Sequence, residues 1–584
     1  MSLLNIESLS VSYADEKVID KLSFSVNAGE SVGLVGESGS GKTQTALAIL
    51  GLLPANADTA GSIRFDGKEL LGAREQELNR IRARRISIVF QDPMLALNPY
   101  LRIGEQIGRI LIAHGLSGGA EAKERVIEML NAVGLPDPER QSRAYPHQLS
   151  GGMRQRAMIA SALITRPDLL IADEPTTALD VTVQAQILEL LNAIREDTAL
   201  LLITHDLGVV AGHCERMLVL ERGRLIESGT TREVFGAPQH AHTKAMLEAA
   251  PRIRRSDIPS PVDGEVLLEA DGVSVSYREA GHGQLHAVRD VDLTLKRGET
   301  LAIVGESGSG KSSLVRAILG LIPMRAGTVS FYGETLAKEA GARAAKTRRD
   351  LQMVFQDPVG SLNPQMSVVD IVREPLLVHE PLLTNAEGVQ RVSEMLQQIG
   401  LNDVFLGRYP HELSGGQAQR VAIARALILK PKVLVCDEAV AALDGSVREQ
   451  ILDRLRALQA SSGLSILFIS HDLGVVRAIS HRVLVMYLGR LAELADNESL
   501  FTRPQHPYTK ALLDAVPVPD PNLPRKEYIL SGEVPSILTP PSGCAFHPRC
   551  AYAVSRCVRE RPAALGTNSN SSVVACHRAD ELSL

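Results

Sequence analysis

Short runs of consecutive apolar residues recur along this 584-residue chain and alternate with segments of helical periodicity. Residues 31–35, 169–172 and 200–204 are such runs in the first half, and residues 301–304 form one in the second. Runs of this length are typical of strands buried on both faces of a sheet. Because they alternate with helical segments, the pattern predicts an α/β fold with a mostly parallel sheet covered by helices.

A different pattern, in which apolar and polar residues alternate, opens each half of the chain. Residues 4–13 alternate up to Tyr13, and residues 273–277 do so up to Tyr277. Alternation of this kind predicts half-buried strands. A tyrosine at the end of such a strand could stack on a nucleotide base, and a purely structural strand tyrosine is the equal alternative.

The two halves repeat each other. Five landmarks recur at offsets of 264 to 269 residues, namely Lys42 and Lys311, Gln91 and Gln356, Ser150 and Ser414, Asp173 and Asp437, and His205 and His471. A nearly constant offset predicts a duplicated domain of roughly 250 residues. We therefore expect domains at residues 1–250 and 266–520, a Pro-rich linker at 251–265, and a Cys-rich C-terminal segment at 521–584.

Each half carries the pattern G-x-x-x-x-G-K-[ST] between an apolar run and a helical segment. In such a loop the glycines let backbone N–H groups face phosphates, the lysine reaches the terminal phosphates, and the hydroxyl ligates Mg²⁺. The predicted phosphate-binding residues are Gly36, Ser38, Gly39, Ser40, Gly41, Lys42 and Thr43, and Gly305, Ser307, Gly308, Ser309, Gly310, Lys311 and Ser312. Two matches in the same context exclude chance.

Each half also ends a later apolar run in two adjacent acids, Asp173 and Glu174 in the first and Asp437 and Glu438 in the second. The first acid of each pair can hold Mg²⁺, and the second can activate a water for attack on a phosphate. A strand end that simply meets solvent is the alternative.

Polar residues follow two further apolar runs in each copy. Gln91 and Gln356 enter loops broken by proline, where a glutamine can reach Mg²⁺ or position a water. His205 and His471 stand at another strand end. A solvated turn glutamine and a structural histidine are the alternatives for a single copy.

A Ser-Gly-Gly sequence directly precedes a helical segment in each half. Free N–H groups and the positive end of the helix dipole make such a position an anion site, although a simple helix N-cap has the same sequence. The residues are Ser150, Gly151 and Gly152, and Ser414, Gly415 and Gly416.

The six cysteines fall into two groups. Cys214 and Cys436 lie in apolar runs and are predicted core residues. The other four, with five, six and eighteen residues between them, are Cys544, Cys550, Cys557 and Cys576. Clustered thiols in a reducing compartment favour a metal over disulfides. Their gaps exceed the usual zinc spacing, whereas four thiolates suit an iron–sulfur cluster, so spacing alone leaves the question open.

Composition narrows the function classes. A net charge of −6, 3% aromatic residues and no tryptophan argue against a main role in nucleic-acid binding. No apolar run reaches 18 residues and residues 1–10 lack a signal-peptide pattern, so we expect a cytoplasmic chain whose membrane spans, if it needs any, come from other polypeptides.

With these motifs assembled, residues 3–250 and 266–520 resemble two ATP-binding-cassette (ABC) nucleotide-binding domains in tandem. The most specific marker is Leu-Ser-Gly-Gly downstream of a phosphate loop, at residues 149–152 and 413–416. The resemblance implies that ATP and Mg²⁺ bind, that Tyr13 and Tyr277 stack on adenine, and that the repeated glutamine, acids and histidine form two hydrolytic sites. The implied catalytic residues are Glu174, Glu438, His205, His471, Gln91 and Gln356, and the implied Mg²⁺ ligands are Thr43, Gln91, Asp173, Ser312, Gln356 and Asp437.

The resemblance further implies that the halves pack head to tail about a pseudo-two-fold axis. Each ATP would then lie between one half's phosphate loop and the other half's Ser-Gly-Gly. After its two acids the first copy reads Pro-Thr-Thr at residues 175–177, as the family usually does. The second copy departs from this pattern and reads Ala-Val-Ala at residues 439–441. The acids are unchanged, so two competent sites are expected.

The segments after each cassette and Tyr-Pro-His before each signature are similar to those of bacterial importers for dipeptides, oligopeptides, glutathione, nickel and opines. This implies two membrane permeases and an extracytoplasmic binding protein as partners, at the cytoplasmic face of the inner membrane. Residues 543–550 resemble the tail of peptide-importer ATPases, which implies a [4Fe–4S] cluster on the four C-terminal cysteines, with zinc held partly by His547 or His577 as the alternative. The rival function is a soluble tandem ATPase that acts on ribosomes or DNA. The short linker and the negative net charge of the chain argue against it.

Overall fold

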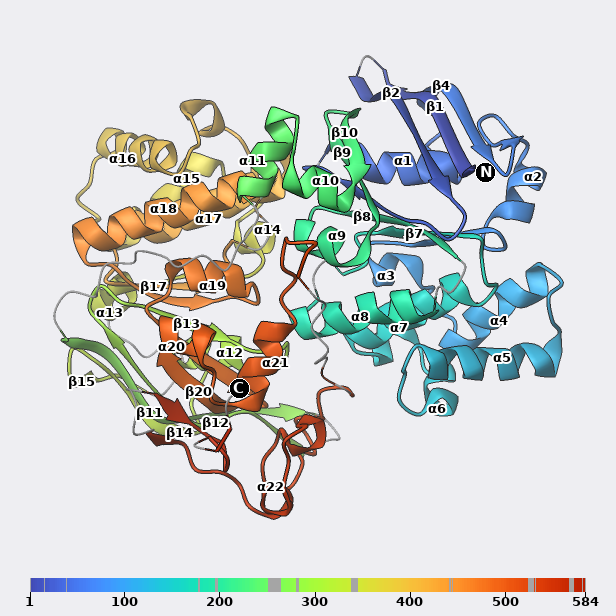
Figure 1. Ribbon diagram of the computed structural model, residues 1–584. Coiled ribbons are helices and arrows are strands. Elements are labelled where there is room, and N and C mark those ends of the chain that lie inside the picture. Colours follow the sequence, from blue (N-terminus) through green and yellow to red (C-terminus); the bar gives the residue numbers. More distant parts are fainter. Residues whose placement is uncertain are drawn as a thin grey trace. The chain divides into compact units, whose positions relative to one another are not determined.

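The computed structural model of this chain resolves into two compact units, each described by itself (Figure 1). Unit 1 comprises Met1–Leu179, Val183–Ala250 and Pro517–Glu527, and unit 2 comprises Asp180–Thr182, Pro251–Val516 and Tyr528–Leu584. The structure describes residues 2–14, 16–37, 39–176, 179–194, 198–249, 264–279, 283–337, 345–440, 443, 445–523, 530, 532–566, 572–579 and 581–582. Among the predictions, Ser38 of the first phosphate loop and residues 251–263 of the linker lie outside these residues.

Unit 1 contains two sheets. The central sheet has the order β10-β9-β3-β8-β7-β6, in which β10 is antiparallel to β9 and the other neighbours are parallel. Its strands are β3 (Ser31–Val35), β6 (Ile86–Val89), β7 (Leu169–Asp173), β8 (Ala199–Thr204), β9 (Arg216–Glu221) and β10 (Arg224–Thr230). The predicted runs at 31–35, 169–172 and 200–204 therefore form β3, β7 and β8, side by side in one mostly parallel sheet.

The second sheet of unit 1 is antiparallel, with the order β2-β1-β4-β5. Its strands are β1 (Ser2–Tyr13), β2 (Glu16–Asn27), β4 (Ala57–Phe65) and β5 (Lys68–Glu69). Apolar periodicity indicated β1 but not this separate sheet, because alternation identifies a half-buried strand without naming its partner.

The helices of unit 1 follow the strands in α/β order (Figure 1). They are α1 (Lys42–Ile49), α2 (Glu75–Ile81), α3 (Pro93–Ala96), α4 (Ile103–Ala113), α5 (Gly119–Ala132), α6 (Pro138–Ser142), α7 (Gly151–Leu163), α8 (Val181–Ile194), α9 (Leu207–His213), α10 (Thr231–Gly236) and α11 (Ala241–Ala249), with a 3₁₀ turn at Pro146–Gln148.

Unit 2 repeats this plan and extends it. Its antiparallel sheet has the order β12-β11-β14-β15, and its central sheet has the order β16-β17-β18-β13-β19-β20-β22-β21. The strands are β11 (Val266–Glu279), β12 (Gly283–Lys296), β13 (Thr300–Val304), β14 (Ala326–Phe331), β15 (Glu334–Thr335), β16 (Leu351–Val354), β17 (Val433–Asp437), β18 (Ser465–Ile469), β19 (Arg482–Tyr487), β20 (Arg490–Asp496), β21 (Leu565–Gly566) and β22 (Val573–Val574). The last two strands come from the C-terminal segment, so this segment pairs with the edge of the second central sheet.

The helices of unit 2 match those of unit 1 up to the C-terminal segment. They are α12 (Lys311–Ile318), α13 (Ala345–Asp350), α14 (Pro358–Ser361), α15 (Val368–His379), α16 (Asn385–Gln398), α17 (Gly415–Leu427), α18 (Gly445–Ser462), α19 (Leu473–Ile479), α20 (Asn497–Thr502), α21 (Pro507–Asp514) and α22 (Ser555–Arg559), with 3₁₀ turns at Asp403–Phe405, Pro410–Glu412 and His547–Arg549. None of the helices in the described ranges has the length and apolar content needed to span a bilayer.

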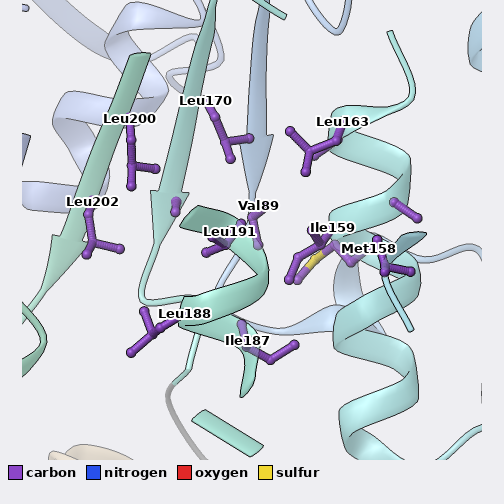
Figure 2. Close-up of a cluster of buried hydrophobic side chains, with 14 of the residues drawn as sticks. Val89, Met158, Ile159, Leu163, Leu170, Ile187, Leu188, Leu191, Leu200 and Leu202 are labelled. Carbon is purple, nitrogen blue, oxygen red and sulfur yellow. The ribbon is translucent and has the colours of Figure 1, made fainter. Parts of the chain in front are cut away.

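The core of unit 1 lies between its central sheet and the helices α7 and α8 (Figure 2). Leu170 on β7 and Leu200 and Leu202 on β8 are at most 2% exposed. The helices contribute buried side chains from α7 (Met158, Ile159 and Leu163) and α8 (Ile187, Leu188 and Leu191). Each fully buried side chain of this size stabilises the fold by about 1.5–3 kcal/mol. This packing fixes the carboxyl ends of the strands, where the predicted site residues stand.

Candidate active sites

The first phosphate loop connects β3 to α1, and its lysine donates hydrogen bonds back to carbonyl groups of the same loop. Lys42 Nζ donates to the carbonyl oxygens of Gly36 and Glu37 at 2.8 Å each, and the lysine is only 6% exposed. Gly39 and Gly41 have φ of 79° and 98°, in the left-handed region that glycine adopts without strain. Because α1 begins at Lys42, the free N–H groups of its first turn face the loop, which is the arrangement that binds phosphate.

The second loop, between β13 and α12, has the same geometry. Lys311 Nζ donates to the carbonyls of Gly305 and Glu306 at 2.7 and 2.9 Å, and Gly310 has φ of 96°. Burial lowers the pKa of the Lys311 ammonium, since the charged form has lost water. Nearby carboxylates, among them Asp437 and Glu438, offset part of this loss, and a polyphosphate placed in the loop would add further negative charge beside the buried cation.

The two acids of each copy stand at the ends of β7 and β17. Burial raises the pKa of Asp173 and of Asp437. Within the described ranges, one carboxylate oxygen of each, Asp173 Oδ1 and Asp437 Oδ2, is buried without a hydrogen-bond partner. The other oxygen of Asp437 accepts a hydrogen bond from Ser312 Oγ at 2.9 Å. A buried carboxylate oxygen beside a hydroxyl fits a hard cation such as Mg²⁺, which prefers oxygen ligands.

The second acid of each pair is held between a glutamine and a histidine. Gln91 Nε2 donates to Glu174 Oε2 at 2.9 Å, and His205 Nδ1 lies 3.2 Å from Glu174 Oε1. Glu174 has φ of 46°, an uncommon backbone conformation for a non-glycine residue and one that clusters at functional sites. The glutamate raises the pKa of His205 through their hydrogen bond.

The second copy reproduces this cluster. Gln356 Nε2 donates to Glu438 Oε2 at 2.8 Å, His471 Nδ1 lies 3.5 Å from Glu438 Oε1, and Glu438 has φ of 52°. The hydrogen bond with His471 lowers the pKa of Glu438, and the same pairing raises the pKa of His471. Glu438 is therefore ionised at neutral pH, as a residue that accepts a proton from water must be.

The two strand tyrosines reach the helix that follows each loop. Tyr13 Oη donates to Gln44 Oε1 at 2.6 Å, and Tyr277 Oη lies 3.0 Å from Ser313 Oγ. Gln44 and Ser313 lie in the first turns of α1 and α12, directly after the phosphate loops. Each tyrosine is thus tied to the residue two positions after the loop lysine, and its stacking on adenine stays a prediction.

The sequence profile of the ABC transporter family matches residues 19–177 and 288–441, which are the two halves that carry these clusters. The chain belongs to the ABC transporter family. A second profile, described as the oligopeptide/dipeptide transporter C-terminal region, matches residues 226–269 and 492–557. The ABC cassette is an ATPase, so this chain is an ABC-type ATPase. That the phosphate loops, acids and glutamines described above form two copies of its hydrolytic site stays a prediction.

Curated relatives match most of this ABC protein. The peptidoglycan transport ATP-binding protein YejF of Agrobacterium fabrum is 46% identical over 531 residues, which cover 88% of this chain and 96% of the relative. The glutathione import ATP-binding protein GsiA of Pectobacterium atrosepticum is 41% identical over 582 residues, covering 91% and 93%. The solved structure of a bacterial ABC transporter cassette is 30% identical and covers 40% of this chain and 99% of its own, with a TM-score of 0.38.

The Ser-Gly-Gly signatures of this ABC protein begin helices, as predicted. Ser150 is the N-cap of α7 and accepts a hydrogen bond from the Met153 N–H at 3.2 Å. Ser414 is the N-cap of α17 and accepts one from the Gln417 N–H at 3.3 Å. Capping thus accounts for both hydroxyls within their own units, and their contribution to an ATP site stays a prediction.

The four C-terminal cysteines line one pocket, together with His506, Phe546, His547 and His577. Across the described ranges, however, no group of three or more His, Cys, Asp or Glu side chains is close enough to hold a metal ion. Burial raises the pKa of Cys544 and Cys550 to about 11, so both thiols are protonated at neutral pH. The donor chemistry suits a cluster, but the described side chains are not grouped closely enough to hold a metal, so the predicted iron–sulfur or zinc site stays a prediction. Cys214 and Cys436 are buried in the two cores, which confirms that prediction.

Sequence reasoning missed a buried glutamine behind the acids. Gln155 on α7 is 2% exposed and its Nε2 donates to the Pro175 carbonyl, which ties the signature helix to the loop after Asp173 and Glu174. Its counterpart Gln419 is fully buried, and neither polar atom of its side chain has a hydrogen-bond partner within the described residues. The loop that Gln155 contacts in the first copy reads Pro-Thr-Thr, whereas the equivalent loop of the second copy, residues 439–441, reads Ala-Val-Ala. This sequence difference was the signal from which the different bonding of the two glutamines could have been predicted.

Proposed function

We propose that this chain hydrolyses ATP at two sites and thereby drives the import of peptides or related small solutes, glutathione among them, through partner membrane permeases. The single observation that carries the proposal is that both halves hold a lysine, a hydroxyl, two acids, a glutamine and a histidine, with matching lysine–carbonyl and glutamine–glutamate distances. The match to the oligopeptide/dipeptide transporter C-terminal region and the import names of the relatives support the substrate class.

In the proposed mechanism, Lys42 and Lys311 exchange their carbonyl partners for the terminal phosphates of ATP. When bound, Mg²⁺ neutralises charge that develops on those phosphates. The residues that would hold it are Thr43, Gln91 and Asp173 in the first site and Ser312, Gln356 and Asp437 in the second. Glu174 and Glu438 then accept a proton from the attacking water, while His205 and His471 orient the glutamates.

We further propose that the signature of each cassette completes the site of the other. Each ATP would then be a ligand of both cassettes at once, and hydrolysis would remove the bridge. Driving a two-state equilibrium from almost fully open to almost fully closed takes roughly 5.5 kcal/mol of differential binding, which two polyphosphates can supply. Loops after Gln91 and Gln356 would transmit this motion to the permeases at the cytoplasmic face of the cell membrane, and an extracytoplasmic binding protein would deliver the substrate.

The test is uptake by membrane vesicles that carry the chain with candidate permeases and a binding protein from the same organism. We expect ATP-dependent accumulation of a peptide or of glutathione, and its loss when both Glu174→Gln and Glu438→Gln are introduced. A chain that co-purifies with ribosomes or DNA, and leaves uptake unchanged when it is absent, would contradict the proposal.

The C-terminal cysteines are proposed, separately, to bind a [4Fe–4S] cluster, with zinc as the alternative. The support is that Cys544, Cys550, Cys557 and Cys576 converge on one pocket whose donor set suits such a cluster. Iron and acid-labile sulfide should be found in anaerobically purified chain and should fall in the Cys550→Ser variant, with Cys214→Ser as the control. A colourless, zinc-loaded protein would reject the cluster.

A further inference from the structure

The C-terminal segment of unit 2 reaches the second phosphate loop through a buried ion pair. Arg549 Nη1 donates to Glu306 Oε2 at 2.7 Å, and Nη2 donates to Glu306 Oε1 at 2.9 Å. The two side chains are only 3% and 1% exposed. A two-pronged, charge-assisted pair of this kind fixes orientation as well as distance. Because Glu306 directly follows Gly305, the pair holds the first turn of the loop.

The backbone of Glu306 connects this ion pair to the phosphate-binding lysine. Its N–H donates to Tyr508 Oη at 2.8 Å, and its carbonyl accepts from Lys311 Nζ at 2.9 Å. The side chain of Glu306 is held by Arg549 and also accepts a hydrogen bond from Thr182 Oγ1 at 2.5 Å, while Tyr508 holds its amide and Lys311 its carbonyl. A shift of the Arg549 guanidinium would displace the carbonyl that orients the Lys311 ammonium.

An aromatic cluster joins the same place to the cysteine pocket. Phe546, which lies between Cys544 and Cys550 in the sequence, is 2% exposed and packs against Tyr487 and Tyr508 with ring centroids 5.3 Å away in both cases. Phe546 also lines the pocket of the four cysteines. Phe546 therefore contacts the cysteine pocket on one side and Tyr508, the hydrogen-bond partner of Glu306, on the other.

Among the residues that the structure describes, none gives the first phosphate loop an equivalent ion pair or aromatic support. Glu37, which follows Gly36 as Glu306 follows Gly305, is exposed. At the 266-residue offset, Tyr487 and Tyr508 correspond to Glu221 and His242, and His242 Nδ1 lies 3.6 Å from Glu221 Oε1. The four clustered cysteines follow only the second cassette.

We propose that Arg549 is a positioning residue of the second ATP site, so that ATP binding at this site, and not at the first, depends on the C-terminal cysteine segment. The inference rests on the proposed function in one respect, namely that the second loop binds ATP. It assigns to the segment 544–557 a role that needs no contact with nucleotide: Arg549 holds Glu306, Glu306 holds Lys311, and Lys311 meets the phosphates.

The experiment titrates a fluorescent ATP analogue into the full chain carrying Lys42→Ala, which silences the first site, and Glu438→Gln, which blocks hydrolysis at the second. Adding Arg549→Gln removes the guanidinium that pairs with the buried Glu306 carboxylate, to which Thr182 Oγ1 still donates, and should weaken binding about tenfold or more. Arg549→Lys keeps the charge without the planar fork and should give an intermediate affinity. The double variant Arg549→Gln with Glu306→Gln should lose less affinity for the ATP analogue than the two single variants lose together, because the two residues act through one contact.

Two controls separate a local role from general damage. Arg556→Gln removes an arginine of the same segment whose pair with Glu560 is exposed, and it should leave the affinity unchanged. In the reciprocal chain, with Lys311→Ala and Glu174→Gln, Arg549→Gln should leave binding at the first site unchanged. Equal affinity of the parent and Arg549→Gln chains at the second site would overturn the proposal, as would an equal loss at both sites.

Hydrogen–deuterium exchange without nucleotide tests the same contact independently of ATP. In Arg549→Gln the amides of residues 305–312 should exchange faster, while those of 36–43 and of strand β13 keep their rates. Unchanged exchange at 305–312, or a uniform rise that includes β13, would contradict a positioning role. A parent chain that binds no ATP would contradict the proposed function, and the exchange rates would still decide the role of Arg549.

Discussion

The two phosphate loops hold their lysines alike but sit in different surroundings. The lysine-to-carbonyl distances are 2.8 and 2.8 Å in the first loop and 2.7 and 2.9 Å in the second. The glutamate that supplies one of those carbonyls is exposed in the first loop and 1% exposed in the second, where Arg549 covers it. The duplication has thus kept the chemistry of the site and changed what supports it.

The loops that follow the acids show the reverse contrast, because here the loop of the first copy has the additional hydrogen bond. In the first copy Gln155 donates to the Pro175 carbonyl, whereas in the second copy Gln419 makes no such bond within the described residues. The first site is therefore anchored from its signature helix, and the second from the C-terminal segment. Each of the following predictions tests whether this contrast between the two sites changes ATP turnover or stability.

The largest effect is expected from the catalytic acids. Losing the activating carboxylate in the double variant Glu174→Gln with Glu438→Gln should lower ATP turnover by roughly 10²–10⁴-fold. Each single variant, measured by phosphate release, should keep the turnover of the other site. Unequal single losses would show that the anchoring of the sites matters for hydrolysis, and wild-type turnover in the double variant would remove both residues from their assigned roles.

Matched core truncations should affect both units equally. Leu170 and Leu434 occupy the same position on β7 and β17, and both are fully buried. Leu→Ala at either position should cost about 2–5 kcal/mol of unfolding free energy, since it removes buried methyl groups and leaves a cavity. Calorimetry should show the transition of the altered unit moving alone, and a joint shift would indicate that the units unfold together.

The buried glutamines should respond differently to the same substitution. Gln155→Leu leaves the Pro175 carbonyl without its donor and should destabilise the chain by about 1–3 kcal/mol. Gln419→Leu removes a buried amide without a partner and should be neutral or stabilising. Chemical denaturation of both variants measures the difference, and equal losses would mean that the Gln155 bond contributes nothing.

The smallest effect is expected from the histidines. Glutamate raises the pKa of His205 and His471, so the stability that each pairing adds is fully present below the unfolded pKa of about 6.5 and is lost as pH rises through the folded value. The side chains are 60% and 31% exposed, so screening should keep each contribution below about 1 kcal/mol, with His205 the weaker. His→Gln variants should flatten the pH dependence of unfolding, and unchanged profiles would contradict the pairing.

Repetition made the phosphate loops, acids, glutamines and histidines predictable, because all of them are defined by local sequence at strand ends. The buried strands β3, β7, β8 and β13 followed from apolar runs for the same reason. The antiparallel sheets and the Arg549–Glu306 pair did not, because they join residues far apart in the chain and an arginine beside a cysteine carries no sign of its distant partner. The capping role of Ser150 and Ser414 was foreseen as an alternative, and the structure describes it.

Nucleotide stoichiometry tests the central claim, that the chain carries two competent ATP sites, most directly. In the double variant Glu174→Gln with Glu438→Gln, trapped ATP should reach two molecules per chain, and adding either Lys42→Ala or Lys311→Ala should reduce this to one. A plateau at one molecule per chain without the lysine substitutions would contradict the account.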